Sequence, residues 1–328
     1  MKKIGLGLIG LGYIGKIHLQ HSLKLANADL VAVSDISKRA LKDARNVGAR
    51  KTFDNYEQLL RDSEVDAVIV ALPTHLHLQC ARRAAEERKN IFLEKPIARN
   101  VQEAQEIISA AQRNSVKLMI GYPARFNPGY RDLRGKINNG TLGDVEIARA
   151  TNISCGPFFH RMQDYAPTPV PEWWFNKELT GGGALMDLGC HMINLLRWYF
   201  GEITDIKSHL GYRFNFDFED SATCLAKFKS GTLGIVNVGW FSQVLSENIE
   251  LFGTVQSAKT QHHAPSPLLT AAQMLTMGQS GFFGSHFAEL QYFVNCLIQD
   301  SFPSPSGQDS LKDLEAIHSA YNNQIRLG

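Results

Sequence analysis

Short aliphatic and β-branched runs alternate with amphipathic stretches over the N-terminal third of the chain. The runs predict strands at residues 4–9, 30–34, 65–72, 90–93 and 116–120, and the stretches predict helices at residues 13–25, 38–46, 76–87 and 101–112. Strands that alternate with helices indicate βαβ units and a parallel sheet. Because right-handed crossovers place helices on both faces of such a sheet, the pattern predicts a doubly wound, Rossmann-type domain.

The pattern changes after residue 122. A helix is expected from Asn127-Pro128 to about residue 138, and strand-like alternation begins at residues 142–153. Antiparallel strands are predicted at residues 203–212, 222–228, 233–240 and 247–252, with a hairpin turn at residues 229–232. The sequence therefore predicts an α/β protein of two domains, an NAD(P)-binding Rossmann domain at residues 1–122 and a substrate domain at residues 123–328.

Composition and charge exclude several classes of protein. The 328 residues are 44% hydrophobic and carry a formal net charge of +2, which gives no electrostatic footprint for nucleic acid. The five cysteines are widely spaced and odd in number, which is typical of reduced thiols rather than disulfides or a zinc site. No apolar run reaches the roughly 18 residues of a membrane helix. The N-terminal lysines and the apolar run after them imitate a signal peptide, but glycines interrupt the run and no cleavage site follows. We therefore expect a cytoplasmic protein.

A glycine-rich segment lies at the first predicted strand-to-helix turn. Residues 10–15 fit the pattern G-x-G-x-x-G, and so does an overlapping match that begins at Gly5. The downstream match follows a full strand and opens a helix, as a dinucleotide-binding fingerprint requires. Its glycines permit a tight turn, close approach of the pyrophosphate and close packing of helix on strand. The expected cofactor contacts in this segment are Gly10, Gly12, Tyr13, Ile14 and Gly15.

Asp35 lies twenty positions after Gly15, at the end of the second predicted strand. A carboxylate at this place accepts hydrogen bonds from the adenosine ribose and repels a 2′-phosphate, so NAD is favoured over NADP. Lys38 and Arg39 lie close by in sequence and keep NADP possible. The alternative for Asp35 is a turn cap.

Two further segments carry candidate chemistry. Glu94-Lys95-Pro96 follows the predicted strand at residues 90–93, and ligands of open α/β sheets bind outside the carboxyl ends of the strands. A run of three glycines at residues 181–183 opens a predicted helix on which Asp187 and His191, four apart, share one face. Alone, Lys95 is compatible with a surface position and the Asp–His pair with a structural hydrogen bond. No third ligand accompanies that pair, so we expect no metal.

Together these motifs resemble the Gfo/Idh/MocA oxidoreductases, the relatives of glucose–fructose oxidoreductase and inositol dehydrogenase, over nearly the whole chain. The shared elements are residues 10–15, the Pro73-Thr74-His75 turn, residues 94–96 and the Asp187-x-x-x-His191 helix. The resemblance implies that the family's catalytic Lys, Asp and His are Lys95, Asp187 and His191. It also implies a large, mostly antiparallel sheet in the second domain, with one face over the substrate and the other forming a homodimer or homotetramer.

The resemblance further implies the binding residues. The expected cofactor contacts beyond the glycine segment are Asp35, Leu72, Pro73, His75, Glu94 and Lys95, and the expected substrate contacts are Lys95, Arg125, Trp174, Asp187 and His191. The aromatic run that contains Trp174 suits a sugar ring and is equally compatible with a core position. The chain departs from many relatives at Asn194, where they carry Asp, and from some inositol-using relatives at Ala124-Arg125, where they carry two arginines.

Two segments are expected to be loops near the site or an interface. The first, residues 157–171, is rich in proline and carries His160 and Arg161. The second, residues 261–280, carries His262 and His263 and no formal charge.

Hydride transfer dictates the expected chemistry. Oxidation of an alcohol by NAD removes a hydride from carbon and a proton from oxygen. His191 is the expected proton carrier because imidazole titrates near neutral pH. Lys95 is expected to hold the substrate oxygen or to share the proton, and Asp187 to orient both.

The sequence thus predicts an NAD(P)-dependent oxidoreductase that acts on a secondary alcohol or ketone carbon of a sugar, polyol, cyclitol or nucleotide sugar. One alternative is a redox-neutral enzyme, of the glycosidase or oxidoreductase type, that keeps NAD tightly bound. The other is a non-catalytic dinucleotide-binding regulator.

Overall fold

The computed structural model describes residues 3–158, 171–242, 245–263 and 282–325. The chain divides into two compact units, the first made of Met1–Phe126 with Gln279–Leu311 and the second of Asn127–Gly278 with Lys312–Gly328. His160, Arg161 and residues 264–280 of the second expected loop lie outside the described residues.

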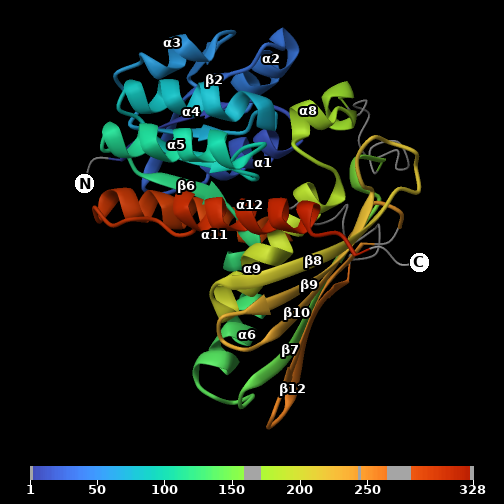
Figure 1. The fold of residues 1–328 in the computed structure, drawn as a ribbon. Helices are drawn as coiled ribbons and strands as arrows, with labels where there is room; N and C mark the ends of the chain where they lie inside the picture. Colours follow the sequence, from blue (N-terminus) through green and yellow to red (C-terminus); the bar gives the residue numbers. More distant parts are fainter. Residues whose placement is uncertain (1–2, 159–170, 243–244, 264–281, 326–328) are drawn as a thin grey trace. The chain divides into compact units, whose positions relative to one another are not determined.

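The first unit is built on a six-stranded parallel sheet with the strand order β3-β2-β1-β4-β5-β6. Figure 1 labels its strands β2 and β6. Its strands are β1 Ile4–Ile9, β2 Ala28–Ser34, β3 Lys51–Phe53, β4 Ala67–Val70, β5 Asn90–Glu94 and β6 Leu118–Gly121. Its helices include α1 Tyr13–Ser22, α2 Lys38–Asn46, α3 Tyr56–Leu60, α4 His77–Glu86 and α5 Val101–Arg113. The predicted Rossmann-type sheet is confirmed. The strand β3 and the helix α3 are elements that the sequence analysis did not predict.

The strand order places the candidate site within this unit. β1 and β4 are neighbours at the centre of the sheet, and the order of the strands reverses between them. Every residue of β4 is buried, as is every residue of β1 after Ile4. In open α/β sheets such a reversal leaves a crevice at the carboxyl ends of the strands. Gly10 follows β1 at this edge, and Ala71 follows β4.

A helix from far along the sequence completes the first unit. α11, Phe282–Ile298, contacts α1 and the 3-10 turn η2, Pro123–Phe126. Its buried Leu290, Phe293 and Val294 belong to the same core cluster as Phe92 of β5. The Phe92 and Phe293 rings meet edge to face with centroids 5.7 Å apart. The sequence pattern gave no indication of this helix, because the partners that bury it lie far away in the chain.

The second unit is built on a six-stranded sheet with the order β12-β11-β7-β10-β9-β8 (Figure 1). Its strands are β7 Val145–Ile153, β8 Ile203–Gly211, β9 Ser221–Phe228, β10 Leu233–Gly239, β11 Ser246–Gly253 and β12 Ser257–His263. Only β7 and β10 pair in parallel, and the other neighbours are antiparallel, as expected. Its helices include α6 Pro128–Asn138, α8 Lys177–Thr180, α9 Cys190–Phe200 and most of α12 Gly307–Asn322.

The expectation that His262 and His263 lie in a loop is wrong. Both lie on β12, where His262 pairs with Glu247 and His263 with Ser246 of β11. The segment lacks the apolar alternation that marks a half-buried strand, and backbone pairing along the edge of a sheet needs no such alternation.

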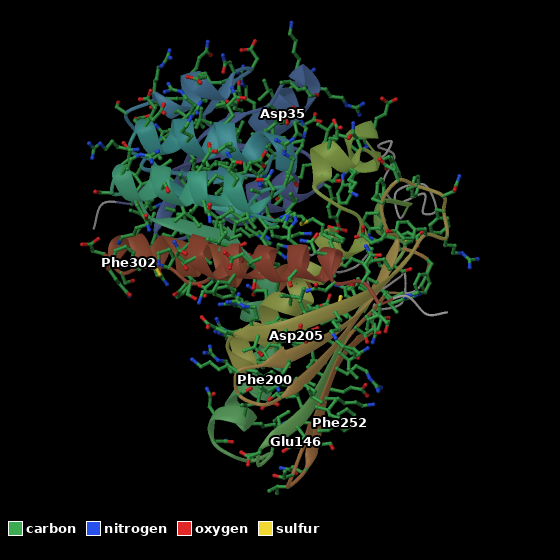
Figure 2. All side chains as sticks on the ribbon, viewed as in Figure 1. Asp35, Glu146, Phe200, Asp205, Phe252 and Phe302 are labelled. Atoms are coloured by element: carbon green, nitrogen blue, oxygen red, sulfur yellow. The ribbon has the colours of Figure 1, made fainter. Side chains whose placement is uncertain are left out.

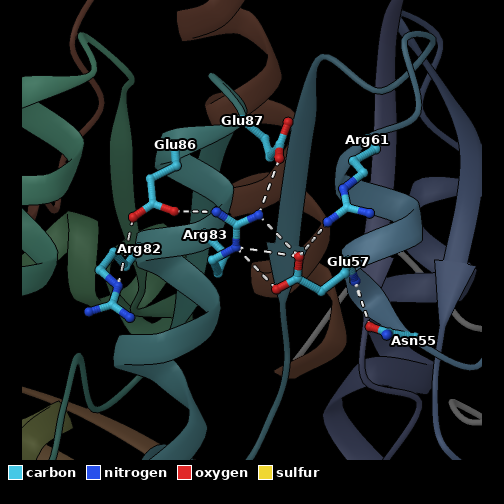
Figure 3. A network of polar contacts seen from close by, with 7 residues as sticks. All are labelled: Asn55, Glu57, Arg61, Arg82, Arg83, Glu86 and Glu87. Atoms are coloured by element: carbon cyan, nitrogen blue, oxygen red, sulfur yellow. Dashed lines mark hydrogen bonds and ion pairs between the residues drawn. The ribbon is translucent and has the colours of Figure 1, made fainter.

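Surface ion pairs join α3 and α4 in the first unit (Figure 3). The Arg83 guanidinium contacts Glu57 of α3 at 3.1 Å and also pairs with Glu86 and Glu87. The Arg83 charge at this end of α4 is therefore balanced by three carboxylates. Among the helices of the described residues, none is long and apolar enough to span a membrane.

Candidate active site

The glycine loop after β1 has the shape of a dinucleotide cradle. Gly10 has a φ of +94°, and a Cβ there would lie 2.3 Å from the carbonyl oxygen of Ala71. A Cβ on Gly15 would lie 2.0 Å from the carbonyl oxygen of Gly10. A Cβ on Gly12 would meet no described atom within 4 Å. Gly10 and Gly15 are therefore required by the fold itself, whereas Gly12 faces open space.

Asp35 fastens this loop. It lies just after β2, at the place labelled in Figure 2, and its Oδ2 accepts a hydrogen bond of 2.6 Å from the Leu11 N–H. Its Oδ1 accepts one of 2.7 Å from the Ser37 N–H. A carboxylate has about four acceptor positions, so both oxygens retain capacity for ribose hydroxyls. Asp35 can therefore cap the turn and accept hydrogen bonds from a ribose at the same time.

These features fit a dinucleotide. Among the described residues no side chain caps the N-terminus of α1, which begins after Gly12, so the helix end is suited to a phosphate. The open space at Gly12 has room for a pyrophosphate, and the Asp35 carboxylate directly after β2 has acceptor positions to spare. NAD bound here would be held by Gly10, Gly12, Tyr13, Ile14, Gly15 and Asp35.

The turn after β4 connects to the turn after β5 through a buried histidine. The His77 ring contacts the carbonyl oxygens of Pro96 at 3.0 Å and Leu72 at 2.9 Å. Burial lowers the pKa of His77. It also lowers the pKa of His75, which is less buried. Leu72, Pro73 and His75 are half-buried beside this link, in the first unit. The sequence analysis did not identify His77, because no motif indicates that its ring contacts two backbone carbonyl groups.

Glu94 ends β5 with its carboxylate turned back into the protein. Its Oε1 contacts Nε2 of His18 at 2.6 Å, and its Oε2 accepts a hydrogen bond of 3.2 Å from the Lys95 N–H. Burial is the largest single influence on Glu94 and opposes its charge, but the hydrogen bond to His18 and the nearby basic groups together outweigh it and lower the pKa of the carboxyl. Lys95 is half-buried, and the Lys95–Pro96 peptide bond is cis.

Arg125 lies in η2 of the first unit and is 5% exposed. Its Nη1 donates a hydrogen bond of 3.4 Å to Oγ of Ser304. Burial raises the pKa of the Glu289 carboxyl on α11 well above its usual value. The nearby charge of Arg125 opposes this shift without cancelling it.

Asp187 and His191 lie in the second unit, where the segment before α9 forms a π-helical turn, Leu185–Gly189. The sequence predicted one helix to residue 200, and the structure begins it with this wider turn. Asp187, Leu188 and His191 are half-exposed, whereas the other residues from Ala184 to Leu196 are buried. π-turns of this kind are frequent at functional sites. The π-turn thus exposes the Asp187 side chain, and the first turn of α9 exposes His191, from an otherwise buried segment.

A buried carboxylate holds the start of this turn. Oε1 of Glu219 accepts hydrogen bonds from the N–H groups of Gly183 at 3.0 Å and Leu185 at 2.9 Å, and from the Tyr321 hydroxyl at 2.8 Å. Burial raises the pKa of Glu219, and the Tyr321 hydrogen bond opposes that shift. A Cβ on Gly183 would lie 1.8 Å from the carbonyl oxygen of Glu219, which explains the glycine.

Asn194 has a partner that explains the departure from Asp. Its side chain is 1% exposed, and its Nδ2 donates a hydrogen bond of 2.6 Å to Oδ2 of the buried Asp313 on α12. Arg197 pairs with the same carboxylate. An Asp at position 194 would face Asp313 as a second carboxylate. The carboxylate beside position 194 in this chain is that of Asp313.

Trp174 belongs to an aromatic cluster in the second unit. It lies in η4, Glu172–Phe175, with its ring centroid 5.1 Å from Trp173 and 6.5 Å from Trp240. Trp240 is 1% exposed, and its Nε1 has no hydrogen-bond partner within the described part of the chain. Trp174 itself is half-buried, so it combines a core contact with an accessible surface.

The predicted site residues divide between the two units. The cofactor residues, Lys95 and Arg125 lie in the first unit, and Trp174, Asp187 and His191 lie in the second. Within the described ranges, no group of three or more His, Cys, Asp or Glu side chains could hold a metal ion. The sequence analysis missed His18, Glu219 and Asp313, whose partners are 76, 36 and 119 residues away.

Comparison with known proteins identifies the family. Residues 4–122 match the model of the oxidoreductase family with an NAD-binding Rossmann fold, and residues 130–259 match the GFO/IDH/MocA C-terminal domain. The chain therefore belongs to the Gfo/Idh/MocA oxidoreductases, an NAD-binding family, as its motifs predict.

Relatives align over most of their length. The oxidoreductase YrbE of Bacillus subtilis is 26% identical over 95% of this chain and 91% of its own. The myo-inositol 2-dehydrogenase of Thermotoga maritima is 25% identical over 93% and 91%. The scyllo-inositol dehydrogenase of Lactobacillus casei, solved with NAD(H) and scyllo-inositol, superposes with a TM-score of 0.81 over 98% of this chain and 97% of that one, at 21% identity. That likeness shows the shared fold.

Proposed function

We propose that this protein is an NAD-dependent dehydrogenase that acts on a secondary alcohol of a cyclitol, sugar, polyol or nucleotide sugar. The observation that carries the proposal is the half-exposed pair Asp187 and His191, on the π-turn and the start of α9, in an otherwise buried helical segment. Relatives named as inositol 2-dehydrogenases support the substrate class. A solved neighbour bound to NADH and UDP-GlcNAcA keeps nucleotide sugars among the candidates.

NAD is the proposed cofactor, with Asp35 as the residue that reads the ribose. The carboxylate of Asp35 would face the 2′-phosphate of NADP, and the two hydrogen bonds that it accepts hold it in place. Leu72, Pro73 and His75 would contact the cofactor from the turn after β4, and Glu94 and Lys95 from the end of β5. NADP use would require Lys38 and Arg39 to outweigh Asp35.

The catalytic residues proposed are Lys95, Asp187 and His191. When bound, NAD supplies the acceptor for the hydride. His191 takes the hydroxyl proton, because imidazole is the side chain whose ordinary pKa lies closest to neutral pH. Lys95 holds the same oxygen and stabilises its developing negative charge. Asp187 orients and polarises His191 and Lys95.

Substrate contacts, assembly and location follow the same proposal. Trp174 would stack on the apolar face of a sugar ring, and Arg125 would bind substrate hydroxyls. The sheet of the second unit exposes Leu225 by 51% and Leu233 by 52%, which supports a homodimer or homotetramer built through that sheet. The cytoplasm is the proposed location, because all five cysteines are buried and none forms a disulfide.

A spectrophotometric screen tests the proposal. Purified protein is incubated with NAD and a panel of inositols, sugars and nucleotide sugars while absorbance at the NADH maximum is recorded. We expect NADH to form with at least one cyclitol or sugar, and formation to be lost in Lys95→Ala and His191→Ala. NADH binding without turnover of any panel member contradicts the proposal and favours a regulator. NAD that survives purification and never accumulates as NADH favours the redox-neutral enzyme.

A further inference from the structure

A buried histidine links the cofactor helix to the turn that carries Lys95. His18 lies on α1, one helical turn after Gly15, and its side chain is fully buried. Its Nε2 contacts Oε1 of Glu94 at 2.6 Å. Within the described residues its Nδ1 has no hydrogen-bond partner. Glu94 is therefore the polar group that fixes the His18 ring.

Glu94 passes this constraint directly to Lys95. Its second oxygen accepts the backbone N–H of Lys95 at 3.2 Å, so one carboxylate joins α1 to the start of the Lys95–Pro96 turn. The carboxylate also packs against β6, where a Cβ on Gly121 would lie 3.1 Å from Oε1. The His18 ring meets Phe92 edge to face at 5.3 Å, so aromatic packing holds its other side. The carboxylate has little room to move without disturbing both elements.

Energetics make this link strong. A hydrogen bond to a buried carboxylate is charge-assisted, and removal of its partner leaves an uncompensated charge in the interior. Glu94 is 6% exposed, so water cannot replace His18. The turn after β5 is thus anchored to the helix whose N-terminus is shaped for the cofactor.

We infer that His18 and Glu94 are positioning residues that set the place of the Lys95 ammonium group and couple it to the cofactor helix α1. The inference rests on the proposed role of Lys95 and names the two residues through which the fold controls it. Neither residue needs to contact the substrate. Because a side chain of α1 fixes the position of Lys95, the lysine keeps a constant position relative to any ligand bound at the N-terminus of the same helix.

The chain provides a matched control on the same helix. His21 is also buried, at 3% exposed, and its ring packs edge to face on Phe287 at 5.8 Å rather than on Glu94. His18→Leu and His21→Leu therefore each replace one buried imidazole of α1 by an apolar group, and only the first removes the partner of Glu94. His18→Gln is the conservative variant, since an amide nitrogen can occupy the place of Nε2.

The first readout is the chemical reactivity of Lys95, which requires no turnover. Each protein is labelled with a limiting amount of an amine-reactive anhydride, and modification of Lys95 is quantified by mass spectrometry relative to the exposed Lys42. We expect His18→Leu to change the relative reactivity of Lys95 several-fold, and His21→Leu and His18→Gln to leave it close to wild type. Equal reactivity in His18→Leu and wild type overturns the inference, even if the protein proves to be a dehydrogenase.

The second readout separates positioning from stability. At saturating NAD and substrate we expect kcat of His18→Leu to fall by about tenfold to a hundredfold with little change in the Kd for NADH, and His18→Gln to recover most of the loss. Equal losses of kcat in His18→Leu and His21→Leu would mean that the pair only stabilises α1. If wild type turns over no substrate, the proposed function fails, while the reactivity of Lys95 still decides the inference.

Discussion

The carboxylate of Asp35 accepts a hydrogen bond of 2.6 Å from the backbone N–H of Leu11, between the first two glycines of the cofactor loop. The residue proposed to discriminate NAD from NADP therefore also determines the shape of the loop that receives the pyrophosphate. Cofactor choice and cofactor affinity are coupled through this one side chain.

Asp35→Ser should weaken NADH binding and shift preference toward NADPH. The variant loses a charged acceptor for Leu11 and the charge that repels a 2′-phosphate, so we expect the Kd for NADH to rise by about tenfold or more. Fluorescence titration with each reduced cofactor measures both effects. An unchanged ratio of the two Kd values would show that Asp35 serves the loop alone.

His191→Ala should lower kcat by at least about a hundredfold while NADH binding stays intact, because the variant removes a proton carrier and leaves the first unit untouched. Leu188 lies three residues before His191 and is also half-exposed, so Leu188→Ala provides the control. Comparable kcat values for His191→Ala and wild type would remove His191 from the mechanism.

Glu219→Ala should destabilise the second unit and lower activity. Three donors, the N–H groups of Gly183 and Leu185 and the Tyr321 hydroxyl, would lose their buried acceptor, at a cost of roughly 2–5 kcal/mol in the free energy of unfolding. Glu219→Gln keeps an acceptor oxygen and should lose much less. Urea denaturation, followed in parallel with kcat, measures both. Equal losses in the two variants would show that charge, not the hydrogen bonds, is what the turn requires.

Glu289→Gln should flatten the dependence of stability on pH. Burial, followed by the nearby charge of Glu94, raises the pKa of the Glu289 carboxyl well above its usual value of 4.5. The folded chain therefore keeps a proton that the unfolded chain releases, and the free energy of unfolding falls as the pH rises from about 4.5 through the folded-state pKa. Glutamine removes that titration and can still accept from the Tyr122 N–H.

Urea denaturation from acid to mildly alkaline pH measures this effect, with the exposed Glu106→Gln as the control. The loss of stability toward high pH should be smaller in Glu289→Gln than in wild type and unchanged in Glu106→Gln. Parallel pH profiles for all three proteins would contradict the assignment.

The periodic elements were predictable from local sequence. Ser37 and Asn100, both of residue types that favour helix N-caps, directly precede the helices predicted at residues 38–46 and 101–112. Their side chains accept the N–H groups of Ala40 at 3.2 Å and of Glu103 at 2.9 Å. The glycine fingerprint and Asp35 were predictable because close contacts restrict these positions to a few residue types. Composition alone does not reveal such restrictions, but the motif does.

What the sequence could not give depends on contacts between distant residues. α11 joins the first unit through side chains that meet β5, about two hundred residues earlier. His18 and Glu94 lie 76 residues apart, and each alone is an ordinary residue of its element. The π-turn at Leu185–Gly189 depends on Glu219, which no spacing rule connects to it.

The most direct test of the account follows the hydride itself. Wild-type protein is incubated with excess NAD and a cyclitol that it oxidises, carrying deuterium on the carbon of the reactive hydroxyl, and the NADH formed is analysed by mass spectrometry. The account predicts many equivalents of singly deuterated NADH per enzyme. Formation of no more than one equivalent, or of unlabelled NADH, would contradict net transfer of hydride from the alcohol carbon to NAD.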